Sequence, residues 1–310
     1  MSVFDLSEAE LDERLAQVPA LVGPRTLEFL TGGLTNRNIK VTTPNGVYVA
    51  RCSDDNAEAL DIDRDAEHLN TRAAAQSGAG APVFDYRPDL GLLVIGYLEG
   101  ATLGDDDFRR EGVAARAARA MRQLHAGPRF VNDFDMFRRQ PRYRATCRDE
   151  GYAVPDGYDD HAPDFERIRE ALAVHDEGTV PCNNDLLAEN FIDDGERIWL
   201  IDYEYSGNND ACFELGNTWT ECKLDLDQLE EMVTAYFGGP RPDKVARARL
   251  QAIVSQYGWA LWGYIQAAVS PLDFDFHGWG TERYEGAVAA MRASDFDRLL
   301  DEVGGNGVGG

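Results

Sequence analysis

The spacing of apolar residues changes near residue 98, and this change limits the folds that the chain can adopt. Before residue 98 the spacing predicts an amphipathic helix at 3–20, strands at 26–30, 38–43, 47–51 and 92–97, and a helix at about 57–77. After it the pattern is mainly helical, at 110–126, 163–175, 226–237, 243–269 and 283–303, with one strand-like interruption at 191–201. We therefore predict an α+β fold with a small β-rich lobe at residues 1–98, a mainly helical lobe at 99–303 and a disordered tail at 304–310.

Two of the early strands carry the signals of a hairpin. Asn45-Gly46 is a turn dipeptide, and apolar residues alternate on both sides of it: Ile39, Val41, Val47 and Val49. The helix that follows should bury one face, which carries Ile62, Ala66, Leu69 and Ala73. These patterns predict an antiparallel strand pair followed by an amphipathic helix.

The chain is strongly acidic, with 55 Asp and Glu against 30 Lys and Arg and a net charge of −25. Such a surface repels phosphate backbones and anionic membranes, so we expect no nucleic acid and no membrane as a partner. The acidity could steer a cationic substrate, or it could keep the protein soluble in concentrated salt. The acidic residues are spread along the whole chain, which favours the second interpretation, a salt-adapted (halophilic) protein.

Three further features concern the cellular location. No run of about 18 apolar residues is present, so no membrane span is expected. The first residues lack the basic and apolar regions of a secretory leader. The five cysteines are scattered and odd in number, which is typical of reduced thiols. We expect a cytoplasmic protein, either a monomer or a homodimer.

The strongest candidate for a functional site surrounds the interruption at 191–201. Two apolar arms flank a turn at 193–196, which predicts a hairpin. A hairpin brings its open ends together, so Asp185 and Asn190 before it should meet Asp202 after it. Carboxylate and amide oxygens suit Mg²⁺, and a remaining carboxylate could orient and deprotonate an attacking hydroxyl.

The same residues also have a purely structural explanation, because Asp and Asn cap and bend turns. That explanation accounts well for Asp193 and Asp194. It accounts poorly for Asp202, which directly follows an apolar strand. On these residues alone, a metal site and a turn structure are equal alternatives.

A longer stretch around these residues resembles a known family. Its motifs are Asn183-Asn184-Asp185, Asn190, the run LIDYEY at 200–205, and the run FELGN at 213–217 followed by Glu221. These motifs resemble those of the choline/ethanolamine kinase family, which shares the two-lobed protein-kinase-like fold of the aminoglycoside phosphotransferases. The resemblance implies that Asp185 is the catalytic base and that Asn190 and Asp202 hold Mg²⁺ on the phosphates of ATP. The family usually has His where this chain has Asn183, and an amide can replace some hydrogen bonds of that His.

The resemblance also implies where the phosphates of the nucleotide lie. Gly32, Gly33, Thr35 and Asn36 belong to a glycine-rich segment between two predicted strands. On pattern alone, a Gly-Gly turn without a ligand is the simpler explanation. In the family, this segment covers the phosphates.

The remaining nucleotide contacts follow from the same resemblance. Arg51 ends a strand and would contact the α- and β-phosphates while pairing with Glu67 on the next helix. Two surface charges are the alternative for this pair. Lys40 is out of phase with the apolar face and is expected to be solvated. Ile95 and Tyr97 would lie in the hinge whose backbone groups bind adenine.

Aromatic residues gather in the last third of the sequence. Trp259 and Trp262 are three residues apart and so share one helix face. In an arbitrary protein such residues fill a core, but stacked aromatic faces also bind quaternary ammonium groups. The family binds choline in an aromatic cage, and the resemblance assigns to that cage Tyr205, Trp259, Trp262, Phe274 and Trp279, with Glu221 as an acid near the cation.

The expected activity is transfer of the γ-phosphoryl group of ATP to the hydroxyl of a small amino alcohol, choline or ethanolamine. A kinase for thiamine, an aminoglycoside or a sugar is one alternative. A non-catalytic module that binds an amine or a nucleotide is another, suggested by Asn183. His125, near the end of a predicted helix, is expected to pack or cap and not to act in catalysis.

Overall fold

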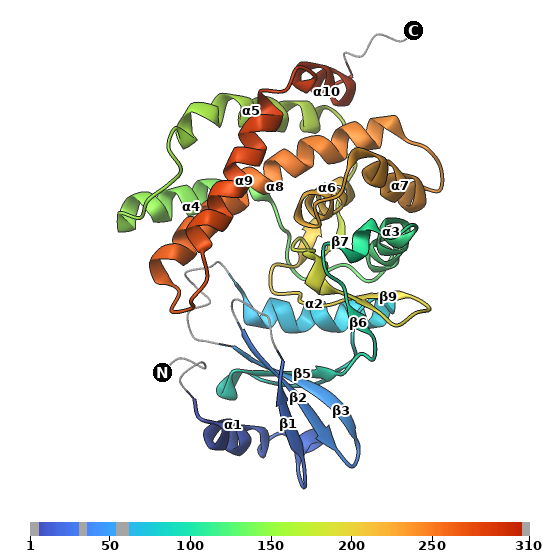
Figure 1. The fold of residues 1–310 in the computed structure, drawn as a ribbon, viewed down its shortest axis with the longest axis vertical. Coiled ribbons are helices and arrows are strands. Elements are labelled where there is room, and N and C mark those ends of the chain that lie inside the picture. Colours follow the sequence, from blue (N-terminus) through green and yellow to red (C-terminus); the bar gives the residue numbers. More distant parts are fainter. Residues whose placement is uncertain (1–5, 31–35, 54–61, 306–310) are drawn as a thin grey trace.

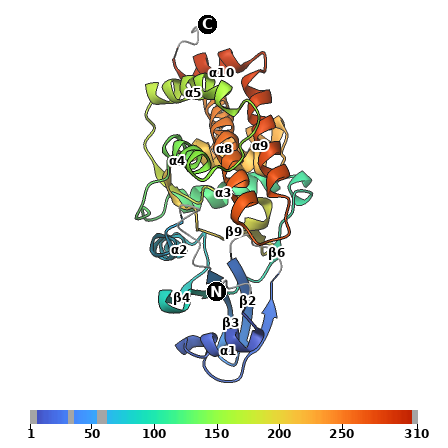
Figure 2. The same cartoon turned by 90° about the vertical axis from the view of Figure 1, so that its left-hand side faces the viewer.

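The computed structural model describes residues 6–30, 36–53 and 62–305. Figure 1 shows an antiparallel sheet at one end of the long axis and a mainly helical part at the other, with helix α2 (Arg64–Ser77) between them. The side view in Figure 2 keeps the same order along this axis. The predicted α+β class, with a β-rich part before a larger helical one, is confirmed.

The N-terminal sheet has five strands in the order β1-β2-β3-β5-β4, and each neighbouring pair is antiparallel. The bounds are Thr26–Phe29 (β1), Asn36–Thr43 (β2), Gly46–Ser53 (β3), Val83–Arg87 (β4) and Leu92–Gly96 (β5). Strands β2 and β3 form the predicted hairpin. The sequence pattern does not predict β4, because its five residues mix apolar and charged side chains that are all at least partly exposed.

Helix α1 (Glu8–Leu15) covers one face of this sheet. Ile39 of β2 is fully buried on that face and lies opposite Ala50 of β3. Side chains alternate along a strand, so Val47 and Val49 lie on the other face of β3. The antiparallel pairing predicted from the four alternating residues is therefore confirmed, although the register of the turn places the valines of β3 on the face opposite to Ile39.

Helix α2 begins after its N-cap residue Asp63. The predicted start near residue 57 falls on 54–61, outside the described residues. The buried face carries Glu67 and Asn70, whereas Leu69, which was expected to be buried, is 42% exposed. This face meets polar groups of the sheet and of the helical part, so it buries paired polar side chains where an apolar stripe was expected.

The helical part contains α3 (Val113–His125), α4 (Met136–Glu150), α5 (Ala162–Val174), α6 (Ala211–Glu221), α7 (Leu226–Phe237), α8 (Pro242–Val269), α9 (Phe276–Met291) and α10 (Phe296–Val303). Short strands lie among these helices: β6 (Ala101–Thr102), β7 (Val180–Cys182), β8 (Phe191–Asp193), β9 (Ile198–Leu200) and β10 (Gly207–Asn209). The predicted hairpin is confirmed as β8 and β9, β6 pairs with β8, and β7 pairs with β10.

Two predictions for the helical part need correction. Helices α4 and α6 are not predicted, since α4 is rich in charge and contains Pro141, and α6 is buried on most sides and so lacks an amphipathic pattern. The segment 283–303 is not one helix, because α9 ends at Met291 and α10 begins at Phe296. The break lets α10 turn and pack on α5 and α8.

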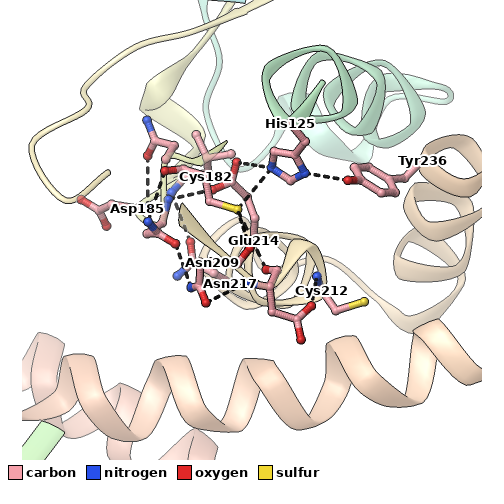
Figure 3. Close-up of polar contacts among 12 residues, drawn as sticks. His125, Cys182, Asp185, Asn209, Cys212, Glu214, Asn217 and Tyr236 are labelled. Carbon is pink, nitrogen blue, oxygen red and sulfur yellow. Dashed lines mark hydrogen bonds and ion pairs between the residues drawn. The ribbon is translucent and has the colours of Figure 1, made fainter. Parts of the chain in front are cut away.

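Helix α8 lies at the centre of the helical part and contacts α4, α6 and α9. Gly216 of α6 allows a close approach to α8, since a Cβ there would stand 2.1 Å from the carbonyl oxygen of Ala248. This contact places the buried polar face of α6 directly behind the loop that follows β7 (Figure 3).

Two expectations about the cysteines and the membrane are also met. All five cysteines are buried and unpaired. Among the described residues, no helix is both long enough and apolar enough to cross a bilayer.

Candidate active site

The loop after β7 and the β8–β9 hairpin bring the three predicted site residues together. Asn190 donates from Nδ2 to the backbone carbonyl of Asp185 at 2.7 Å. Its own carbonyl accepts from the backbone N–H of Ile201 at 3.0 Å. Asp202 follows Ile201 directly, so the convergence predicted from the hairpin is found.

Asn183 joins the two sides of this cluster. Its Nδ2 donates to the carbonyls of Ile201 and Asp202, at 3.0 and 2.7 Å, and its Oδ1 accepts from the backbone N–H of Asp185 at 3.1 Å. The residue is fully buried. Its amide therefore provides three hydrogen bonds that connect the two loops, which is the scaffold role expected for this position.

Asp185 lies where several acidic groups meet. Burial raises its pKa well above the usual range, and the charges of Asp202, Glu221 and Glu204 raise it further. Burial also raises the pKa of Asp202 to about 6, against the opposing charge of Arg51. Acids crowded in this way favour a bound cation, because a cation lowers the free energy of their ionised forms.

The predicted ion pair between Arg51 and Glu67 is present. Nε of Arg51 lies 3.1 Å from Oε1 of Glu67, and both side chains are buried. Nη2 of Arg51 also contacts the carboxylates of Asp202 and Glu204. Arg51 therefore connects strand β3 to α2 and to the residues that follow β9.

Glu204 is a residue of this cluster that sequence reasoning did not single out. Its Oε2 accepts from Nδ2 of Asn36 at 2.8 Å, from Nη2 of Arg51 at 3.1 Å and from Nη1 of Arg64 at 3.1 Å. The donors come from β2, β3 and α2, so one carboxylate joins the sheet, the helix and the loop after β9. The sequence holds one signal for it, an acid between two tyrosines beside a predicted metal ligand.

A small pocket opens beside these ion pairs. Its lining includes Arg51, Glu67, Ile95 and Asp202, so it brings together the predicted hinge and the predicted phosphate and metal residues. Tyr97 is placed differently. Its backbone N–H donates to the carbonyl of Val47 at 3.1 Å, and its ring lies 4.2 Å from Nζ of Lys40.

The glycine-rich segment is described only at its end. Gly32, Gly33 and Thr35 lie outside the described residues. Asn36 is the first residue of β2 and is buried beside Glu204.

Four of the five predicted cage aromatics form one connected group. The ring centroids of Tyr205 and Trp259 are 4.9 Å apart, those of Trp259 and Trp262 6.4 Å, and those of Trp262 and Trp279 5.1 Å. Nε1 of Trp262 donates to the hydroxyl of Tyr205 at 2.6 Å. Phe274 is 43% exposed, and its ring contacts that of Phe276, which in turn contacts Trp262.

Three members of this group are almost completely buried. Tyr205, Trp259 and Trp262 are only 3%, 2% and 4% exposed, as residues of a core would be. However, the buried Nε1 of Trp259 has no hydrogen-bond partner among the described residues. A buried N–H without an acceptor is uncommon in a finished core and is typical of a position completed by a ligand or water.

Glu221 is held by an arginine at the edge of the aromatic group. Arg283 forms a forked pair with it, in which Nε lies 3.0 Å from Oε1 and Nη2 contacts Oε2. The same guanidinium lies 3.2 Å from the ring centroid of Trp279. Sequence reasoning missed Arg283, which is separated from Glu221 by 62 positions.

Comparisons with known proteins agree with this geometry. The profile of choline/ethanolamine kinases matches residues 27–235. The probable ethanolamine kinase of Arabidopsis thaliana is 25% identical over 309 residues, which cover 89% of this chain and 79% of the relative. Protein LicA of Haemophilus influenzae is 26% identical over 215 residues, which cover 66% of this chain and 61% of the relative.

Solved structures share the fold over nearly the whole chain. A choline/ethanolamine kinase family protein from Mesorhizobium loti superposes with a TM-score of 0.84 at 34% identity, covering 96% of this chain and 98% of the other. Choline kinase LicA from Streptococcus pneumoniae superposes with a TM-score of 0.75 at 23% identity, covering 92% and 98%. The fold and the site define a small-molecule phosphotransferase of the kinase-like class. The chain belongs to the choline/ethanolamine kinase family.

Proposed function

We propose that this enzyme transfers the γ-phosphoryl group of ATP to the hydroxyl of a small amino alcohol, choline or ethanolamine. The observation that carries the proposal is the position of Asp185. The two residues before it reach toward both predicted subsites, because Nδ2 of Asn183 donates to the carbonyl of Asp202 at 2.7 Å and Nδ2 of Asn184 donates to the carbonyl of Tyr205 at 3.2 Å. Burial raises the pKa of Asp185, and the charges of Asp202 and Glu221 raise it further. The carboxylate is thus close to both predicted subsites.

In the proposed reaction, Asp185 orients the acceptor hydroxyl and takes its proton. The hydroxyl oxygen bonds to the γ-phosphorus, the bond from that phosphorus to the β–γ bridging oxygen breaks, and ADP leaves. Arg51 would contact the α- and β-phosphates, held in place by Glu67 and Glu204. The backbone of Asp185 is held at two points, with its N–H donating to Oδ1 of Asn183 and its carbonyl accepting from Nδ2 of Asn190, and its carboxylate would bind the acceptor hydroxyl.

The donor set fits Mg²⁺. Asn190 uses Nδ2 to bind the carbonyl of Asp185, which leaves Oδ1 as its ligand atom, and Asp202 supplies a carboxylate. One amide oxygen and one carboxylate match the preference of Mg²⁺ for a few hard oxygen ligands beside phosphate oxygens. When bound there, the ion would neutralise negative charge on the phosphates.

The backbone would complete the nucleotide site. The segment that contains Gly32, Gly33, Thr35 and Asn36 would cover the phosphates. At the hinge, Ile95 lines the pocket, and Tyr97 would contribute its carbonyl because its N–H is bonded to Val47.

The aromatic group is proposed as the site of the acceptor's ammonium group. Two guanidinium groups already lie against its faces, Arg283 on Trp279 and Arg139 at 5.7 Å from the ring centroid of Tyr205. Cations are drawn to such faces by the ring quadrupole, with about 2 kcal/mol when desolvated. Tyr205, Trp259, Trp262 and Trp279 would form the wall, Phe274 the outer rim, and Glu221, shared with Arg283, the nearest acid.

An acceptor panel tests the proposal. ADP release should be measured in concentrated KCl with Mg²⁺ and ATP, and with choline, ethanolamine, thiamine or kanamycin as acceptor. We expect choline or ethanolamine to stimulate turnover most. Stimulation by kanamycin or thiamine alone would assign another acceptor. Nucleotide binding without stimulation by any acceptor would show a binding module.

A further inference from the structure

A guanidinium group from helix α4 lies against rings that adjoin or belong to the aromatic group. Cζ of Arg139 is 4.8 Å from the ring centroid of Phe134 and 5.7 Å from that of Tyr205. A third ring, that of Tyr143, has its centroid at 6.0 Å, and its hydroxyl accepts from Nη1 of Arg139 at 3.2 Å. One positive charge therefore contacts three rings at distances where cation–π attraction is effective.

These rings continue the wall that is proposed for the acceptor. The ring centroid of Trp259 lies 4.9 Å from that of Tyr205. It also lies 6.1 Å from that of Phe134 and 6.5 Å from that of Tyr143. All four side chains belong to residues that are at most 3% exposed. Arg139 and the ammonium group of the acceptor would thus share one buried set of rings, with Tyr205 in contact with both.

The packing of α4 on α8 fixes the place of this guanidinium group. Gly258 precedes Trp259 on α8, and a Cβ at Gly258 would stand 2.1 Å from Sδ of Met136 on α4. The two helices therefore approach closely at the turn of α8 that carries Trp259. Arg139 follows Met136 by three residues, so both lie on the same side of α4. The position of Arg139 beside the aromatic wall thus follows from a contact between two long helices.

A primary ammonium group and a trimethylammonium group depend on such rings to different degrees. A primary ammonium group has three N–H donors, which can bind a carboxylate such as that of Glu221. A trimethylammonium group has no N–H, so ring faces supply most of its binding. A cation that already lies on these rings therefore opposes the binding of trimethylammonium more strongly than that of a primary ammonium group.

We propose that Arg139 is a specificity-determining residue that favours a primary ammonium acceptor, ethanolamine, over choline. Its charge competes for the rings of Tyr205 and its neighbours and repels a second cation beside them. The proposal rests on the function proposed above and concerns the choice between two acceptors of the same site. It predicts a change in the KM for the acceptor, with kcat and the KM for ATP little changed.

A purely structural role of Arg139 is the competing explanation, because the same ring contacts also hold α4 in the helical part. Loss of such support would lower the stability of the enzyme and would affect both acceptors alike. The ratio of kcat/KM for choline to kcat/KM for ethanolamine separates the two explanations. This ratio does not depend on the fraction of enzyme that is folded, since both acceptors meet the same enzyme.

Kinetics of two variants provide the first test. Arg139→Gln removes the charge, so kcat/KM should rise about tenfold for choline and less than about threefold for ethanolamine, as expected for one cation–π contact or one like charge. Arg139→Lys keeps the charge, and its ratio should stay within about threefold of the wild-type ratio. The neutral isostere of choline, 3,3-dimethylbutan-1-ol, should gain less than choline from Arg139→Gln, because Arg139 does not repel an uncharged group.

Arg138→Gln is the matched control. Arg138 is the preceding residue of α4, its side chain is 88% exposed, and its Nε lies 3.3 Å from Oδ2 of Asp135. This variant changes the net charge by the same amount as Arg139→Gln, and in the same KCl concentration its ratio should equal that of the wild type. The proposal is overturned if Arg139→Gln has the same ratio as Arg138→Gln. It is equally overturned if 3,3-dimethylbutan-1-ol gains as much as choline from Arg139→Gln.

Binding of two ions that cannot be phosphorylated separates this proposal from the proposed function. Tetramethylammonium and methylammonium carry the two kinds of head group without a hydroxyl, and quenching of tryptophan fluorescence measures their binding. Arg139→Gln should lower the Kd for tetramethylammonium about tenfold and that for methylammonium less than about threefold, whether or not an acceptor has been found. An unchanged Kd for tetramethylammonium would contradict the proposal. The expected change in an enzyme that phosphorylates no amino alcohol would contradict only the proposed function.

Discussion

Residues at the active site hold backbone conformations and charges that folding alone does not favour. Asn184 and Asp202 have φ values of 70° and 65°, and neither is glycine. Asp185 is held among other acids, which raise its pKa in addition to burial. Such unfavourable features gather where a ligand later compensates for them.

Asp185→Asn should abolish most turnover and yet stabilise the free enzyme. Removing a general base lowers the rate by about 10²- to 10⁴-fold. The pKa of Asp185 is raised in the folded state, so ionisation of this carboxyl destabilises the fold as pH rises above the unfolded value of about 3.9. The Tm of the variant, measured without ligands, should exceed that of the wild type at pH 7.5, and the difference should shrink toward pH 4.5. A variant less stable than the wild type at pH 7.5 would contradict this account of the site.

Glu204→Gln should weaken nucleotide binding. The change removes the negative charge that Arg51, Arg64 and Asn36 share. We expect the KM for ATP to rise about tenfold, the effect of one weakened charge-assisted hydrogen bond, with the KM for the acceptor nearly unchanged. Glu28→Gln is the control, because Glu28 is an exposed residue of β1 whose carboxylate is 3.7 Å from Lys40. If the two variants had equal KM values for ATP, Glu204 would not contribute to nucleotide binding.

At the scale of elements, helix α6 links the core to the chemistry. One side of it rests on α8 through Gly216, and the polar side chains near that contact bind the loop of Asp185. A shift of α6 relative to α8 would therefore move the loop as well.

Gly216→Ala should destabilise the protein and lower kcat together. The new Cβ would lie 2.1 Å from the carbonyl oxygen of Ala248 and 2.8 Å from the backbone nitrogen of Ala252, and no side-chain rotation relieves a clash with backbone. Overpacking of this kind costs about 1–3 kcal/mol of unfolding free energy, which denaturant titration measures. Gly239→Ala is the control, since a Cβ at Gly239 meets no atom within 4 Å. Equal unfolding free energies for both variants would show that the helix contact is looser than described.

At the scale of the whole molecule, charge is divided between two environments. Inside, acids such as Glu67, Glu204 and Glu221 are paired with arginines. Over the whole chain, however, acidic residues exceed basic ones by 25, so the protein as a whole carries a large negative charge. Repulsion among exposed charges falls with salt, because the Debye length shrinks from about 10 Å at 0.1 M to about 3 Å at 1 M.

Salt should therefore raise both Tm and activity. We expect Tm to increase steadily between 0.1 and about 2 M KCl, as screening lowers the self-repulsion of the folded state. Thermal unfolding monitored by circular dichroism, with activity measured in the same series, checks this. A constant or falling Tm over that range would contradict the salt-adapted interpretation.

The sequence determined the features that depend on residues close together in the chain. The β2–β3 and β8–β9 hairpins follow from alternation and turn residues, and the second hairpin is enough to predict that Asp185, Asn190 and Asp202 converge. Helices with clear apolar spacing, such as α7, are also predicted correctly. Features of this kind are local, so their signals are local as well.

Only the tertiary structure decided which distant side chains meet. Glu204 binds Asn36 across 168 positions, and His125 binds Glu214 across 89. Arg283 pairs with Glu221 and so changes the environment of a predicted site residue. Contacts between distant segments depend on how α6, α8 and the sheet pack, and a single sequence carries no spacing that reveals them. The sequence alone therefore predicts the loop of Asp185 and its acidic residues, whereas only the tertiary structure shows which distant side chains bind them.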